Sequence, residues 1–263
     1  MTLLTLSSIG KTFANGTQAL AQLDLTVRQG EFISLLGPSG CGKSTALRMI
    51  AGLERADQGA LTWGAQRPDL GFVFQDATLM PWADVFDNVF LPLRLKGQSR
   101  AQAKPRVMDA LTRVGLAHFA AHMPRELSGG MKMRASIARA LVTEPKLLLM
   151  DEPFAALDEI TRHRLNRDLL SLQTELGMTV IFVTHSVYES AFLSSRICVF
   201  TPRPGRIVET IDVAPITPRT EDFRLSSIYL EACAKASRAL ASAMESVMAV
   251  SYTHLTLPTI LLV

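Results

Sequence analysis

Apolar residues at alternating positions characterise the start of the chain. Residues 3–9 and 20–27 read as strands, and Leu23, Leu25 and Val27 fall on one face of the second segment. Alternation with a period of two is typical of strands that bury one face. The pattern therefore predicts a β-rich opening.

Short and almost fully apolar runs follow later in the chain. They cover residues 31–36, 70–75, 147–152, 179–184 and 197–200. Another short strand is expected near residue 59, and a last strand is expected at residues 206–211. Runs of this kind are typical of parallel strands covered on both faces. Together with the helical segments between them, they predict an α/β fold with an open, largely parallel sheet.

Helical spacing of apolar residues appears between these strands. In residues 99–123, apolar side chains recur at Val107, Leu111 and Val114. This spacing predicts a helical insert, which we place at about residues 90–142. Further helices are predicted at residues 46–51, 135–141, 159–175 and 221–250.

The C-terminal end departs from the rest of the sequence. We expect residues 1–215 to form the main domain and residues 216–250 a short helical extension. Residues 251–263 contain one histidine, almost no other ionisable group and an apolar, β-prone end, and they resemble the translation of sequencing-adapter DNA. We expect this tail to be non-native, and either disordered or prone to aggregation.

Composition is that of a globular protein with a substantial core. Of the 263 residues, 48% are hydrophobic and 19% charged, and the net charge of +3 gives no support for a nucleic-acid partner. Three widely spaced cysteines argue against a disulfide framework or zinc site and favour a reducing compartment. Residues 1–9 lack signal-peptide features, and no run approaches the roughly 18 apolar residues that cross a bilayer. We expect a soluble protein, or one held at a membrane only by partners.

The sequence GPSGCGKST at residues 37–45 matches the phosphate-binding pattern G-x-x-x-x-G-K-[ST]. It falls at a predicted strand-to-helix turn, which is the context that the pattern requires. Glycines let several backbone N–H groups point at one anion, and the N-terminus of the next helix favours negative charge. The Lys43 side chain is expected to reach the outer phosphates and the Ser44 hydroxyl to bind magnesium. The expected nucleotide-binding residues of this loop are Gly37, Pro38, Ser39, Gly40, Cys41, Gly42, Lys43, Ser44 and Thr45.

Polar residues end three of the predicted strands. Gln75, the pair Asp151 and Glu152, and His185 each follow an apolar run. Ligands of open α/β sheets bind outside the carboxyl ends of the strands, so we expect these residues to converge on one edge. The alternative for Asp151 is a cap on the next helix. Two adjacent carboxylates beside a phosphate loop instead favour a metal ion and a water.

Three other features carry weaker signals. Phe13 lies in a loop, where its ring either closes over the core or stacks on a nucleobase. Residues 79–82, LMPW, read as an exposed apolar turn. Residues 127–131, LSGGM, place two glycines at a predicted helix start, which again favours an anion.

Taken together, these motifs resemble the ATP-binding subunit of ABC transporters, over residues 3 to about 205. In that family's terms, GPSGCGKST is the Walker A loop, Gln75 the Q-loop glutamine, LLLMDEP at residues 147–153 Walker B, and His185 the switch histidine. The D-loop contains Asp158. The signature residues are Leu127, Ser128, Gly129, Gly130 and Met131, the last at a position where the wider family usually has glutamine.

The resemblance implies a P-loop NTPase core with an N-terminal antiparallel β subdomain and an inserted α-helical subdomain. It also implies that two copies of the chain sandwich each ATP between the Walker loops of one copy and the signature of the other. Phe13 would stack on adenine. The implied magnesium ligands are Ser44, Gln75 and Asp151, and the implied catalytic residues are Glu152 as general base, His185, Lys43 and Gln75.

Within the family, LMPW, DEPFAALDEITR and TPRPGRI are most similar to the nitrate, sulfonate, taurine and hydroxymethylpyrimidine importers. The implied function is ATP hydrolysis that powers import of a small anion or pyrimidine vitamin precursor, at the cytoplasmic face of the inner membrane. Implied partners are permease subunits, a second copy of the chain and, indirectly, a periplasmic or lipoprotein solute-binding protein. Two alternatives are a soluble ABC-type ATPase in a non-transport machine and another P-loop enzyme, although no Asn-Lys-x-Asp element for reading guanine is present.

Overall fold

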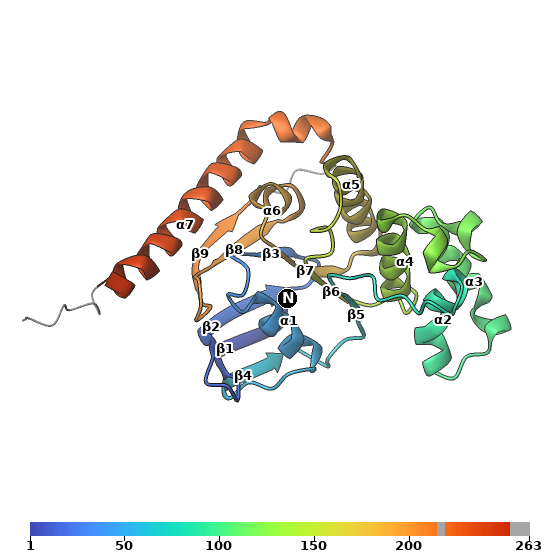
Figure 1. The fold of residues 1–263 in the computed structure, drawn as a ribbon, viewed down its shortest axis with the longest axis horizontal. Coiled ribbons are helices and arrows are strands. Elements are labelled where there is room, and N and C mark those ends of the chain that lie inside the picture. The colour runs from blue at the N-terminus through green and yellow to red at the C-terminus, as the bar shows by residue number, and fades with distance from the viewer. Residues whose placement is uncertain (215–218, 253–263) are drawn as a thin grey trace, which may run out of the picture.

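The computed structural model describes residues 1–214 and 219–252. Two sheets lie side by side, a group of helices projects from one end, and a long C-terminal helix runs along the other (Figure 1). The expected mixed α/β architecture, with an antiparallel sheet at the start and inserted helices, is confirmed.

The N-terminal part of the chain forms a three-stranded antiparallel sheet. Its order is β2 (Gln18–Arg28), β1 (Thr2–Thr12) and β4 (Gln58–Trp63). In β2 the alternation predicts the buried face correctly, because Leu23, Leu25 and Val27 are all buried.

The second sheet has six strands, and the first five in its order run parallel. The order is β5 (Leu70–Val73), β6 (Leu147–Asp151), β7 (Thr179–Thr184), β3 (Phe32–Leu36), β8 (Arg196–Phe200) and β9 (Ile207–Asp212), with β9 antiparallel to β8. Every position of β3, β6 and β7 is buried, as expected for strands covered on both faces. The order places the carboxyl ends of β5, β6, β7 and β3 next to one another.

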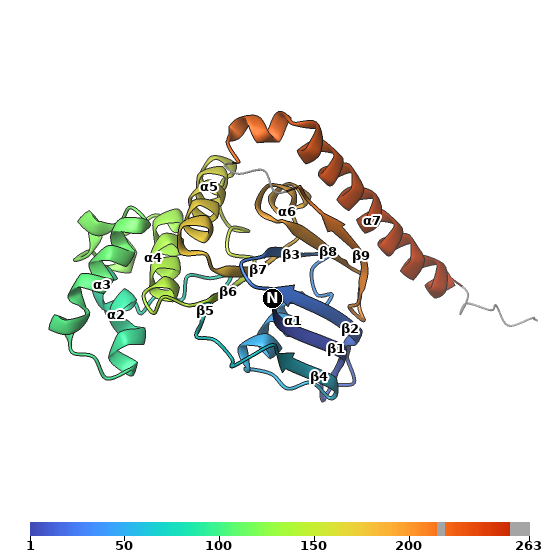
Figure 2. The same cartoon turned by 180° about the vertical axis from the view of Figure 1, so that it is seen from behind.

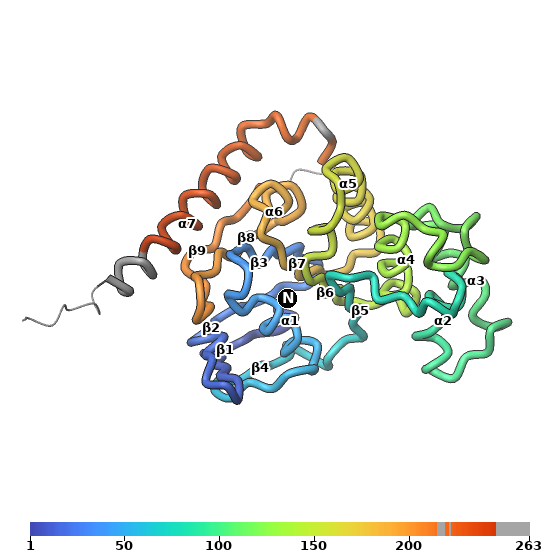
Figure 3. Tube along the Cα trace, in the orientation of Figure 1, coloured from blue at the N-terminus to red at the C-terminus, as the bar shows by residue number. Residues whose placement is uncertain are grey.

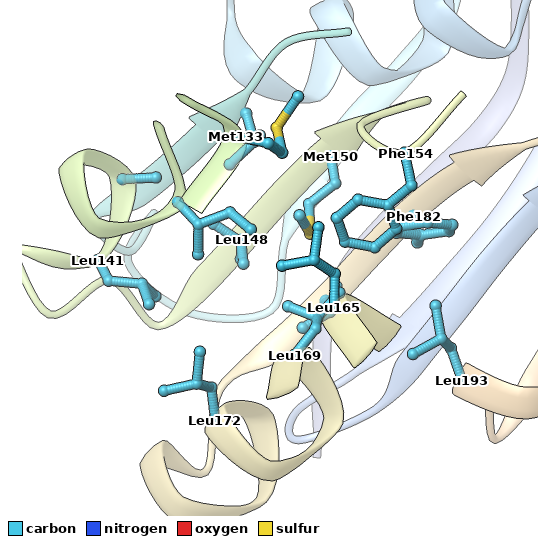
Figure 4. Packing of buried hydrophobic residues seen from close by; sticks show 14 of the residues in the cluster. Met133, Leu141, Leu148, Met150, Phe154, Leu165, Leu169, Leu172, Phe182 and Leu193 are labelled. Carbon is cyan, nitrogen blue, oxygen red and sulfur yellow. The ribbon is translucent and has the colours of Figure 1, made fainter. Parts of the chain in front are cut away.

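Alternate residues of the parallel strands belong to two different cores. Leu147 and Leu149 of β6 pack with α1 (Lys43–Ala51) and the antiparallel sheet. Leu148 and Met150 pack on the other face with α5 (Glu159–Leu176), where Leu165 lies close to them (Figure 4). The six-stranded sheet is therefore the middle layer of the molecule.

The inserted helices lie beyond the β5 end of the sheet (Figure 2). They are α2 (Val85–Leu95), α3 (Arg100–Arg113) and α4 (Gly129–Leu141), with the short 3-10 helices η1 (Ala117–Phe119) and η2 (Pro124–Glu126). Helix formation starts at residue 85, earlier than the expected position near 90. The Asp84 carboxylate accepts a hydrogen bond from the Asp87 N–H and so caps α2, although Pro92 lies inside this helix.

One short helix, α6 (Val187–Leu193), is absent from the sequence-based predictions. It begins at Ser186, whose hydroxyl accepts a hydrogen bond from the Glu189 N–H. The sequence Ser-Val-Tyr-Glu at this point is a capping-box pattern and could have indicated the helix.

The C-terminal part of the chain comprises η3 (Glu221–Leu225) and α7 (Ser227–Tyr252), and α7 packs against α6, β8 and β9 (Figure 3). The helix runs past the expected boundary at residue 250. Residues 253–263, which hold most of the expected non-native tail, lie outside the described residues. Among the described helices, none combines the length and the apolar character needed to span a bilayer.

The C-terminal part is also held by a buried arginine. The Arg219 guanidinium donates hydrogen bonds to the carbonyl oxygens of Phe192 and Ser194, at 2.7 and 3.0 Å. Burial lowers the pKa of Arg219 to about 10. The bonds tie the C-terminal segment to the end of α6.

Candidate active site

The glycine-rich loop at residues 37–42 joins β3 to α1. Gly40 and Gly42 have positive φ angles of +75° and +106°, a region that glycine adopts readily. A Cβ at Gly42 would lie 2.5 Å from the Ala19 carbonyl oxygen in β2. The second glycine of the motif is therefore required both by its conformation and by its close contact with the antiparallel sheet.

The Lys43 side chain is almost fully buried, at 3% exposure. Its ammonium donates hydrogen bonds to the carbonyl oxygens of Gly37 and Pro38, both at 2.8 Å. It also lies 3.9 Å from Oε1 of Glu152. The lysine thus links the loop to the end of β6.

The Ser44 hydroxyl donates a 2.6 Å hydrogen bond to Oδ1 of Asp151. Burial raises the pKa of the Asp151 carboxyl, and this hydrogen bond acts in the opposite direction. Serine and carboxylate oxygens are hard ligands of the kind that Mg²⁺ prefers, and a cation would compensate a carboxylate that is otherwise poorly solvated. Among the described residues, no three or more His, Cys, Asp or Glu side chains are grouped so that they could hold a metal ion by themselves. Ser44 and Asp151 therefore fit a site in which they supply two of the ligands of a metal ion.

Glu152 lies between Lys43 and His185. Its Oε2 is 3.2 Å from Nδ1 of His185, and its side chain is 15% exposed. Its backbone N–H donates to the Val183 carbonyl oxygen at 3.0 Å, and its φ is +45°. A non-glycine residue in this region is strained, and such strain is concentrated at functional sites.

A cavity of about 300 Å³ opens beside the glycine-rich loop. Predicted site residues that line it are Phe13, Gly40, Gly42, Lys43, Ser44, Thr45 and Glu152. The Phe13 ring is 36% exposed and belongs to a turn in which its N–H donates to the Thr17 carbonyl oxygen. An aromatic ring and a phosphate-type loop therefore border the same space.

Four residues that the sequence reasoning did not propose also line this cavity. They are Asn15, Thr17, Ala19 and Arg203. The first three sit in or beside the turn that carries Phe13, and an aromatic loop residue could have directed attention to them. Arg203 comes from the turn after β8, and its sequence, TPRPGRI, carried no signal of a position near residue 40.

Other predicted residues lie away from this cavity. Gln75 is exposed, just after β5, at the sheet edge shared with Asp151 and His185. Asp158 caps α5 by accepting a hydrogen bond from the Thr161 N–H, which lowers the pKa of its carboxyl. The alternative in which Asp151 caps the next helix is therefore wrong, because Asp158 caps that helix, α5.

The LSGGM turn starts α4. Ser128 is exposed, and its hydroxyl accepts a 3.3 Å hydrogen bond from the Met131 N–H. A Cβ at Gly130 would lie 2.7 Å from Cγ2 of Thr161 in α5. The turn therefore neighbours the start of α5, and its residues are not among those lining the cavity beside the glycine-rich loop of the same chain.

The site consists of a strand, a glycine-rich loop and a helix, with a buried lysine and with two carboxylates at the end of a parallel strand. This combination defines a P-loop nucleoside triphosphatase. Comparison with known proteins identifies the family of P-loop proteins to which the chain belongs. The chain belongs to the ABC transporter family, whose family model matches residues 20–155. As a member of this family it binds ATP and hydrolyses it in a reaction coupled to transport.

Relatives from bacteria and archaea cover most of the chain. An uncharacterised ABC transporter ATP-binding protein of Methanocaldococcus jannaschii is 43% identical over 86% of this chain and 85% of its own length. The spermidine/putrescine import ATP-binding protein PotA of Escherichia coli K12 is 45% identical over 78% of this chain, which spans 56% of PotA.

Solved structures agree with these relatives. The ATP-binding cassette MJ0796, in a dimeric post-hydrolysis state with ADP and phosphate, is 32% identical, with a TM-score of 0.73, over 81% of this chain and all of that one. CbiO1 of Clostridium perfringens, part of the transporter complex cbiONQ, is 28% identical, with a TM-score of 0.72, over 80% and 88% of the two chains.

Proposed function

We propose that this ATPase powers import of a small solute through a membrane permease, and that the solute is a nitrate-, sulfonate- or taurine-like anion or a pyrimidine vitamin precursor. The observation that carries the catalytic part is the position of Glu152, between the Lys43 ammonium and the His185 imidazole. The solute class rests on LMPW, DEPFAALDEITR and TPRPGRI, which are similar to the corresponding importers. PotA, whose name describes an importer, supports the direction of transport.

The proposed chemistry assigns one task to each side chain. Lys43 and the loop N–H groups bind the outer phosphates of ATP. Ser44 and Asp151 would hold Mg²⁺, with Gln75 as a further ligand, and the ion would neutralise charge on the phosphates. Glu152 accepts a proton from the attacking water, and His185, 3.2 Å from it, orients that water against the γ-phosphate.

We further propose that two copies of the chain complete each site. The signature turn begins α4 at the exposed residues Ser128 and Gly129, and a helix N-terminus suits an anion, but the turn does not line the cavity of its own chain. If the signature turn faced the cavity of a partner copy, Ser128, Gly129 and Gly130 would face the γ-phosphate held by Lys43 of that copy. The dimeric form of MJ0796 supports this arrangement.

Phe13 is proposed to stack on the adenine ring of ATP. Replacing it with alanine should weaken ATP binding about tenfold, because aromatic stacking contributes roughly 1–3 kcal/mol per base. Replacement with tryptophan, which keeps a stacking surface, should retain most of the affinity. Titration of the two variants with ATP measures the difference, and equal affinities would exclude stacking by this residue.

A groove beside β5 is the proposed docking surface for the permease. It has a volume of about 530 Å³ and lies between β5, α2 and α4, with an apolar wall that includes Phe72, Phe74 and Leu91. Leu95, 79% exposed, also borders it, and Trp82, 77% exposed, stands before α2. Exposed apolar surface of this kind is typical of a protein-protein interface. Docked to a permease through this groove, the chain would lie at the cytoplasmic side of the inner membrane.

Reconstitution with the permease tests the proposed function. We expect ATP hydrolysis in proteoliposomes to rise when the solute-binding protein and its anion are added. The double substitution Trp82→Asp and Leu95→Asp should reduce this stimulation at least about tenfold, since large apolar anchors dominate interface energies. Leu225→Asp, at a residue that is 80% exposed in η3, serves as the control and should keep the stimulation. Stimulation by DNA or ribosomes, with none by a permease, would favour the non-transport alternative.

A further inference from the structure

The turn between β8 and β9, at residues 201–205, packs directly against the glycine-rich loop. The Gly205 N–H donates to the Ala19 carbonyl oxygen at 2.9 Å, and the Gly205 carbonyl oxygen accepts from the Ala21 N–H at 3.2 Å. A Cβ at Gly205 would lie only 2.0 Å from the Cys41 carbonyl oxygen. The backbone of the turn therefore touches the backbone of the loop, with no side chain between them.

Hydrogen bonds within the turn fix its shape. The Thr201 hydroxyl donates to the Pro204 carbonyl oxygen at 2.9 Å and accepts from the Arg206 N–H at 3.1 Å. The Thr201 N–H donates to the Arg206 carbonyl oxygen at 2.9 Å. Arg203 thus projects from a rigid turn, which lowers the entropy lost when its side chain is held in one place.

Arg203 connects this turn to the phosphate-binding loop. Its Nε and Nη2 both donate to the Gly40 carbonyl oxygen, at 3.0 and 2.9 Å. The peptide plane between Gly40 and Cys41 is trans, so the Cys41 N–H points away from the side on which Gly40 O lies. With the carbonyl held by the guanidinium, this N–H stays directed to the opposite side of the C–N bond, within the same peptide plane. An anion-binding loop depends on such fixed N–H directions.

We propose that Arg203 is a positioning residue for the nucleotide. It holds the Gly40 peptide in the orientation that binds phosphate, so that the loop is organised before the nucleotide arrives. This inference rests on ATP binding at the loop and does not depend on the permease or on the solute. Arg203 and the neighbouring Arg206 are both exposed, but it is the Arg203 guanidinium that donates to the Gly40 carbonyl oxygen, whereas Arg206 donates its backbone N–H to the Thr201 hydroxyl.

The test uses the purified chain and compares Arg203→Ala with Arg206→Ala, which removes the same charge from the same turn. We expect Arg203→Ala to raise the Kd for Mg-ADP and the KM for ATP about tenfold, because a charged hydrogen bond is lost at the loop. The kcat at saturating ATP should change less than about threefold, since a positioned loop is restored once nucleotide is bound. Arg206→Ala should match the unchanged protein in both constants.

A lysine substitution separates positioning from charge. Arg203→Lys keeps the charge but can direct only a point-like ammonium at Gly40 O, so its Kd should fall between those of the unchanged protein and Arg203→Ala. The proposal is overturned if Arg203→Ala leaves Kd unchanged, or if kcat alone falls. It is also overturned if Arg206→Ala causes the same loss, because the general positive charge would then suffice. Melting curves without nucleotide check that each variant is folded.

Discussion

Replacement of Glu152 by glutamine is expected to reduce turnover of ATP by roughly 10²–10⁴-fold, the usual contribution of a positioned acid–base group. The amide has nearly the same shape as the carboxylate, but it cannot accept a proton from the attacking water. The contact with His185 and the position near Lys43 should survive. The Kd for ATP should therefore change by no more than a few fold.

Single-turnover kinetics and equilibrium titration with ATP separate the two effects. Glu231→Gln makes the same chemical change on the exposed face of α7 and should leave both quantities unaltered. Hydrolysis by Glu152→Gln at a near-normal rate would remove Glu152 from the role of general base.

The second large effect is expected from Lys43→Met, which keeps the length of the side chain and removes its charge. The ammonium is buried and held by two loop carbonyl oxygens, so its charge lies at a fixed position beside the loop. Loss of a buried, hydrogen-bonded charge costs 2–5 kcal/mol, and we expect ATP to bind roughly 100-fold more weakly. The effect of Lys43→Met is therefore expected in the Kd for ATP, whereas the effect of Glu152→Gln is expected in turnover.

Lys104→Met, at an exposed position in α3, is the matched control for this substitution. It should bind ATP as the unchanged protein does. If Lys43→Met retained full affinity, the phosphate-binding role assigned to the loop would be wrong, and the cavity beside Phe13 would need another ligand.

Much of the site could be predicted from the sequence because its chemistry is local. The fixed spacing of the glycines, Lys43 and Ser44 predicts the geometry of the phosphate-binding loop. The buried apolar strands predict that Asp151 and His185 lie at strand ends. Strand order then brings them to one edge, since β6 and β7 are neighbours. The roles of Gln75 and the signature turn stay predictions, because they depend on a bound nucleotide and a second chain.

Other features could not be predicted because they depend on contacts between distant segments. Arg203 and Gly40 are 163 positions apart, and no periodicity links them. The short helix α6 was missed because seven residues give too little helical repeat, even with a capping signal at Ser186. The early start of α2 follows from the cap at Asp84, a local signal that the apolar pattern hides.

The left-handed backbone at Glu152 has a consequence for the protein as a whole. A side chain in this region destabilises the native state by about 1–3 kcal/mol, and glycine would avoid that penalty. Glycine, however, has no carboxylate to place between Lys43 and His185. At this position, the residue that would make the fold most stable is therefore not the residue that supports ATP hydrolysis. Stability and activity are in conflict here.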